Sequence, residues 1–98
     1  PEVCILVMTS PPSVLHRKFK NTFIEKYAEI IEDNAHVNNY AVWNLLDVFG
    51  GNKSINRNAA KGYMARDKVH YSKLGYEKQA ELFFEALEFN YEQFKSAQ

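Results

Sequence analysis

The sequence predicts an α/β fold built on parallel strands, and three stretches of the chain lead to this prediction. Residues 3–8 form a continuous apolar run rich in β-branched side chains, which is typical of a strand buried on both faces of a parallel sheet. A helical pattern over residues 13–34 and a second short strand pattern over residues 37–43 complete one right-handed strand–helix–strand unit. An amphipathic pattern over residues 73–94 predicts a long final helix that covers one face of the sheet.

Turn-forming residues mark the ends of the first strand and the first helix. The run Thr9-Ser10-Pro11-Pro12 ends the strand, because proline fixes its own backbone and cannot donate a backbone hydrogen bond. Asn34 is the predicted end of the helix. His16 is interpreted as a surface residue and His36 as part of a loop. The stripes expected to face the sheet are Phe19, Phe23, Tyr27, Ile30 and Ile31 in the first helix, and Tyr76, Ala80, Phe83, Phe84, Leu87, Tyr91 and Phe94 in the last.

The segment between the second strand and the last helix contains two short helical stretches. Residues 44–49 predict a helical turn that ends at Gly50-Gly51. Ser54 is a candidate N-cap for a short helix through residue 60, and Gly62 is its predicted stop. Ser72 has the same capping role at the start of the last helix.

The composition limits the class of protein. Ninety-eight residues are enough for one small domain, and equal counts of basic and acidic residues, 12 each, leave no electrostatic footprint for nucleic acid. Cys4 is the single cysteine, so no internal disulfide can form, and its apolar surroundings predict a small buried side chain. Three scattered histidines without a cysteine cluster give no metal-ligand spacing, and we expect neither a metal nor a cofactor. No apolar stretch is long enough to span a bilayer.

The candidate catalytic residues are Asp67 and His70, three positions apart in the loop before the last helix. A carboxylate that accepts a hydrogen bond from one imidazole nitrogen fixes the tautomer and leaves the other nitrogen free to act as a base. The alternative interpretation is a solvated loop whose aspartate caps a turn and whose histidine faces water. Ser10 and Ser13 are the serines nearest the end of the first strand, but neither lies in a recognisable activating turn, so the sequence offers no nucleophile. The segment around Lys53 lacks the glycine that a phosphate-binding loop places before its lysine, which argues against nucleotide binding.

Several motifs in order resemble the C-terminal half of a GDSL-type (SGNH) serine esterase. The resemblance is strongest over residues 43–87 and is similar to bacterial esterases that act on acetylated sugars, including peptidoglycan O-acetylesterases. The motifs that carry it are Pro11-Pro12, Trp43-Asn44-Leu45-Leu46 with Gly50-Gly51, Ser54-Ile55, Lys61-Gly62-Tyr63-Met64-Ala65, Asp67-Lys68-Val69-His70, and Tyr71-Ser72 with Gly75-Tyr76.

The resemblance implies a flavodoxin-like α/β/α sandwich of which residues 1–98 form a partial domain. It also implies ester hydrolysis through an acyl-enzyme, in which His70 is the general base and Asp67 orients it. The family's Gly-Asp-Ser-Leu segment and the Gly and Asn of its oxyanion hole have no match in this chain. We therefore expect the 98 residues alone to be inactive. The resemblance favours a secreted or bacterial-envelope setting.

Two strands make a poor sheet, and the first would have an unpaired edge. The start of the chain at the edge of a strand suggests that it was cut from a longer protein. We therefore expect a partner, either a missing N-terminal half of the same hydrolase domain or a second copy that associates through the exposed strand. The alternative function is a non-catalytic α/β interaction module in which Asp67 and His70 have only a structural role.

Overall fold

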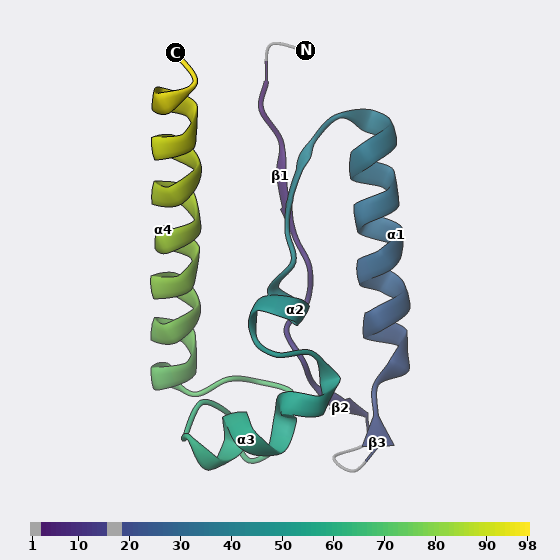
Figure 1. The fold of residues 1–98 in the computed structure, drawn as a ribbon. Coiled ribbons are helices and arrows are strands. Elements are labelled where there is room, and N and C mark those ends of the chain that lie inside the picture. Colours follow the sequence, from purple (N-terminus) through teal and green to yellow (C-terminus); the bar gives the residue numbers. More distant parts are fainter. Residues whose placement is uncertain (1–2, 16–18) are drawn as a thin grey trace.

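The structure is a computed structural model, and it describes residues 3–15 and 19–98. At its centre, strands β1 (Leu6–Met8) and β4 (Ala41–Trp43) pair in parallel, with Leu6 opposite Ala41 and Met8 opposite Trp43. Helices α1 (Thr22–Asn38) and α4 (Lys73–Ser96) lie on opposite sides of this pair (Figure 1). The predicted mixed α/β class with parallel strands is confirmed at this level. The interpretation of His16 falls outside the described residues.

Both central strands are shorter than predicted. The first helix begins at Thr22 rather than near residue 13, and it continues past its predicted end. Helix α1 does not stop at Asn34, whose side-chain amide donates to the backbone oxygen of Ile30, and it includes His36, which was predicted to lie in a loop. The helix ends at Asn39, which adopts the left-handed conformation (φ 57°) and donates its backbone N–H to Ala35. The segment that was expected to extend β4 at its start is therefore the last turn of a helix.

The chain between β1 and α1 forms a small antiparallel pair, β2 (Val14–Leu15) and β3 (Phe19–Lys20), that the sequence did not predict. Beyond β4 come the short helix α2 (Leu45–Val48), the 3₁₀ turn η1 (Asn52–Ser54) and helix α3 (Ile55–Ala60). These match the two predicted helical stretches.

Of the two predicted boundaries of α3, the stop at Gly62 is confirmed and the side-chain cap by Ser54 is wrong. Gly62 follows the helix with φ 79°, a left-handed conformation that glycine adopts without steric cost, and the predicted stop is confirmed. Ser54 does not cap α3 with its side chain; instead its hydroxyl lies 2.8 Å from the carbonyl oxygen of Phe49 and accepts a bond from the Asn58 amide. Ser54 therefore secures the α2–α3 connection from inside.

The buried core lies at the carboxyl end of the two central strands. Leu45, Phe49 and Tyr71 are its buried members, and the Phe49 and Tyr71 rings meet edge to face with centroids 5.2 Å apart. Partly buried side chains surround them: Trp43, Tyr63, Met64 and Leu82. This core fixes α2, the segment before α4 and the start of α4 to one another.

The side of α1 that faces the sheet is not the predicted aromatic stripe. Ala28 and Ala35 are its buried residues, and Ile31 of the predicted stripe is half-buried, while Phe23, Tyr27 and Ile30 are exposed. The helix carries two apolar faces, and the smaller side chains lie against the sheet because they let the helix approach it closely. Phe19 lies in β3 and is also exposed.

Helix α4 departs from prediction in the same way. Its contact with the sheet centres on Phe83, whose ring centroid lies 4.9 Å from that of Trp43, and on the half-buried Leu82 and Ala86. Of the predicted stripe only Phe83 points at the sheet. The other members are all exposed: Tyr76, Ala80, Phe84, Leu87, Tyr91 and Phe94.

Cys4, predicted to be buried, is exposed, because the segment before β1 has no neighbour on its outer side among the described residues. Within the described part of the chain, no helix has the length and apolar character needed to cross a membrane.

Candidate active site

The loop that carries Asp67 and His70 is held at both ends by backbone hydrogen bonds. Ser72 donates to the backbone oxygen of Tyr63 and Ala65 donates to that of His70, so the two sides of the loop run antiparallel. After the loop, the Ser72 hydroxyl accepts a bond from the backbone N–H of Gly75 and caps α4, as predicted. The candidate residues therefore lie on a short loop with both ends fixed, next to the start of a long helix.

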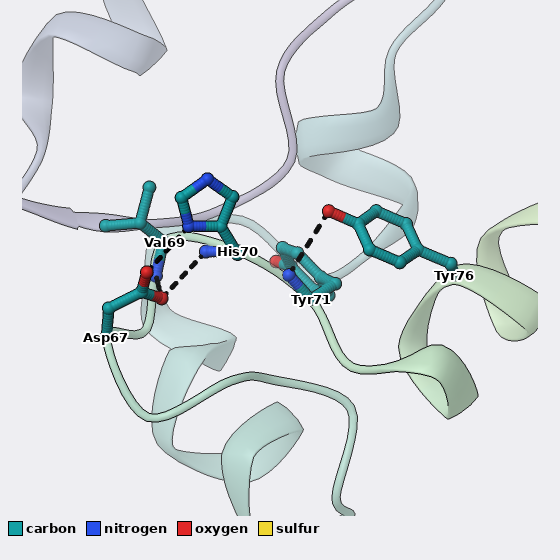
Figure 2. A network of polar contacts seen from close by, with 5 residues as sticks. All are labelled: Asp67, Val69, His70, Tyr71 and Tyr76. Atoms are coloured by element: carbon teal, nitrogen blue, oxygen red, sulfur yellow. Dashed lines mark hydrogen bonds and ion pairs between the residues drawn. The ribbon is translucent and has the colours of Figure 1, made fainter.

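Asp67 is the centre of the hydrogen bonds within this loop. One carboxylate oxygen, Oδ1, accepts from the backbone N–H groups of Val69 and His70, each at 2.9 Å. The other oxygen, Oδ2, lies 2.6 Å from Nδ1 of the His70 ring (Figure 2). The hydrogen bond from the His70 side chain, followed by those from the two backbone amides, holds the pKa of Asp67 well below its ordinary value. Asp67 is thus a carboxylate at neutral pH, and the predicted contact with His70 is present.

His70 presents its second ring nitrogen to solvent. The side chain is 73% exposed, and Figure 2 shows Nε2 pointing away from Asp67. When Nδ1 carries the proton and donates it to Asp67, neutral imidazole has its lone pair on Nε2. This is the arrangement that a general base requires.

Long-range contacts fix where the loop lies relative to the sheet. The buried Tyr71 donates its hydroxyl to the backbone oxygen of Pro12 at 2.6 Å, and the backbone N–H of Val14 donates to that of Lys68 at 3.1 Å. Both acceptor–donor pairs join the His70 loop to the segment that follows β1. Burial raises the pKa of Tyr71 far above its ordinary value, so its hydroxyl keeps its proton. The candidate base therefore lies at the carboxyl end of β1, where open α/β sheets place their sites.

The sequence did not predict that Tyr71 would join the His70 loop to the segment that follows β1. A signal was available, because neighbouring side chains of an extended segment point to opposite sides. If His70 faces solvent, Tyr71 faces the interior. The partner, Pro12, is 59 positions away and could not be found from spacing alone.

Among the described residues, no serine hydroxyl is hydrogen-bonded to His70. Ser13 and Ser54 are buried, Ser10 is exposed, and the hydroxyl of Ser72 is engaged in capping α4. Within the same described part of the chain, no group of three or more histidine, cysteine, aspartate or glutamate side chains is placed to hold a metal ion. The arrangement offers an oriented base and an ionised partner.

Comparison of the chain with family models, with curated proteins and with solved structures gave no match. A function for this protein therefore has to be inferred from its residues and their geometry.

Proposed function

We propose that this chain supplies the acid–base part of a serine esterase of the GDSL/SGNH class. The observation that carries the proposal is the Asp67–His70 pair, in which one carboxylate oxygen binds Nδ1 and the other binds two backbone amides. This fixes the carboxylate and the ring together and leaves Nε2 free. The ordered motifs around the pair, from Trp43 to Leu87, favour this class of enzyme over a general histidine base.

In the proposed reaction, Nε2 of His70 takes the proton of a serine hydroxyl as the serine oxygen attacks the carbonyl carbon of an ester. The imidazolium then gives that proton to the departing alcohol oxygen, and an acyl-enzyme remains. Water, deprotonated by the same nitrogen, releases the acid. Asp67 stays ionised throughout and stabilises the imidazolium, because its pKa lies far below neutrality. The serine and the oxyanion donors come from a polypeptide segment outside these 98 residues.

The substrate class follows from the resemblance: carboxylic esters of carbohydrates, in particular acetyl esters. The same resemblance supports a flavodoxin-like sandwich for the complete domain, of which residues 1–98 would form the C-terminal part. The parallel β1–β4 pair with a helix on each side is compatible with that arrangement.

A second candidate is a non-catalytic α/β interaction module. It is favoured by the two backbone bonds to Oδ1 of Asp67, which close the loop whether or not His70 takes part in chemistry. In this case the exposed imidazole is a solvated side chain, and the function lies in the broad apolar surfaces of α1 and α4.

Hydrolysis of p-nitrophenyl acetate distinguishes the two candidates. The chain alone should be no faster than free imidazole, whereas the chain mixed with a fragment that carries a Gly-Asp-Ser-Leu segment should show an acyl-enzyme burst and turnover. In that mixture His70→Ala should lower kcat by three orders of magnitude or more. His36→Ala, which removes another exposed histidine, is the matched control and should leave the rate unchanged.

A complex that forms without turnover, or turnover that His70→Ala leaves intact, would support the interaction module instead. The oriented base can also be tested without a nucleophile. Nitrogen-15 shifts of His70 in the isolated chain should show the tautomer with the proton on Nδ1, and Asp67→Asn should lose that preference.

A further inference from the structure

The molecule exposes more surface than a compact monomer of its size. Its accessible surface is 7349 Å² for 11.4 kDa, whereas a folded monomer of that mass exposes about 5,800 Å². Its radius of gyration is 15.0 Å, compared with about 13 Å for a compact domain of this length. The surplus is therefore about 1,500 Å² per chain.

The outer edge of β1 is open. Ile5 accepts a backbone bond from Ala41, and Thr9 donates one to Trp43, so alternate residues of this segment face β4. In a parallel ladder the residues between them, Leu6 and Met8, direct their N–H and C=O groups to the other edge. No strand lies there among the described residues, and the side chains of Leu6 and Met8 are 46% and 55% exposed. Such an edge is a template for pairing with another chain.

The exposed apolar stripes of both flanking helices point toward this edge. The stripe on α1 (Phe23, Tyr27 and Ile30) and the stripe on α4 (Phe84, Leu87 and Tyr91) each lie about a quarter turn from the side that faces the sheet. Viewed along each helix axis, the rotation from the sheet-facing side to the stripe has one sense in α1 and the opposite sense in α4. The two helices run in the same direction on opposite sides of the sheet (Figure 1). Offsets of opposite sense on two such helices turn both stripes toward one edge. A right-handed β1–α1–β4 crossover places β1 at that edge.

A groove between the sheet and α4 joins the edge to one of these stripes. It has a volume of ≈ 370 Å³, and its lining is mainly apolar. The segment from Cys4 to Leu6 forms one wall, and Phe83 and Leu87 form part of the other. Since Leu87 belongs to the α4 stripe, the open edge, the groove and the stripe form one continuous apolar surface.

We propose that this surface binds a second copy of the chain. A two-fold axis perpendicular to the sheet would pair the two β1 strands antiparallel, in the order β4–β1–β1–β4. It would place the two α1 helices side by side on one face and the two α4 helices on the other. Closed two-fold dimers are the commonest soluble oligomers, and their interfaces are self-complementary.

The surplus surface area and the net charge of the chain both favour a second copy as the partner that covers this surface. Covering a surplus of about 1,500 Å² on each of two copies buries about 3,000 Å² in total, which lies in the range of obligate homodimers. The net charge of zero removes long-range repulsion between copies. The proposal does not rest on the esterase chemistry, and a missing N-terminal half of the domain would compete with the second copy for the same edge.

The oligomeric state of the 98-residue chain tests the proposal. Sedimentation equilibrium should give twice the 11.4 kDa monomer mass at micromolar concentration. Leu6→Lys, which places a charge at the paired edge, should yield a monomer. Tyr91→Glu should weaken association at least tenfold without touching the strand, so the test survives if Leu6→Lys fails to fold. Val48→Lys alters a similarly exposed apolar residue on α2 and is the matched control, with no expected effect.

A monomer at 100-fold higher concentration, or a dimer that neither variant weakens, would overturn the proposal. A serine-bearing fragment that takes the place of the second copy in a stable one-to-one complex would also overturn it, by assigning the edge to that fragment.

Discussion

The hydrogen bond from Tyr71 to Pro12 is the contact whose removal should most clearly separate the fold from the candidate site. Tyr71→Phe deletes one hydroxyl and keeps the ring against Phe49. The bond is 2.6 Å long, Tyr71 is 5% exposed, and Pro12 is fully buried. The substitution therefore leaves a buried carbonyl oxygen without its donor.

A typical hydrogen bond contributes about 1 kcal/mol net, and an unsatisfied buried acceptor costs about 1–3 kcal/mol. We expect the free energy of unfolding to fall by about 1–3 kcal/mol. For a domain of this size each kcal/mol lowers Tm by roughly 4–8 °C. Urea denaturation monitored by circular dichroism measures the change directly. The Asp67–His70 bond should persist in the folded variant, because it joins residues three positions apart within one loop.

Tyr76→Phe is the matched control. Its hydroxyl accepts only a long bond, 3.5 Å, from the backbone N–H of Tyr71, and its side chain is exposed. Its effect should stay within about 0.5 kcal/mol. Equal effects of the two substitutions, or a stable Tyr71→Phe, would refute the assignment of Tyr71 as the brace between the His70 loop and the segment after β1.

Two further predictions concern the same region. Gly75→Ala places a Cβ against the backbone oxygen of Tyr63, a group that cannot move aside freely, so it should destabilise the chain by about 1–3 kcal/mol or more in urea denaturation. Glu77→Ala, at an exposed position two residues later, should not, and equal stability of the two variants would contradict the reasoning. The pKa of Asp67 is lowered from 3.8 on folding, so its contribution to stability is complete above that pH and is lost as pH falls through the lower folded value. In Asp67→Asn, the free energy of unfolding should therefore fall less as the pH is lowered than it does in the wild type. An unchanged pH dependence would show that the Asp67–His70 contact is weak in solution.

The features that could be predicted from the sequence are local ones. Ser72 caps α4, Gly62 ends α3, and Asp67 contacts His70, since each depends on residues within a few positions. The parallel pairing of β1 and β4 followed from two apolar runs separated by a helix-length segment. In these cases short-range geometry leaves few alternatives.

The features that were missed depend on contacts between distant residues. Helix α1 has two possible apolar faces, and only packing against the sheet selects Ala28 and Ala35 over Phe23 and Tyr27. The β2–β3 pair has no strong strand pattern of its own. Ser54 was expected to cap a helix because serine commonly does so, but the buried carbonyl of Phe49 competes for its hydroxyl.

The same division between local and distant contacts separates the two proposals. The orientation of His70 is complete within its loop, yet the side chain is 73% exposed, whereas a base in a serine esterase acts in a site from which substrate and enzyme exclude water. The proposed chemistry thus requires another polypeptide segment to shield His70 from water at the carboxyl end of β1. The proposed dimer covers the lateral edge of β1 and the stripes of α1 and α4, and this is the edge where the sheet of a complete sandwich would continue. A dimer without a serine-bearing segment would therefore leave Nε2 open to solvent, and dimerisation alone should not create esterase activity. An inactive dimer is the result expected of the chain by itself, whereas a dimer that hydrolyses esters with an acyl-enzyme burst would show that one of the chain's own serines is the nucleophile.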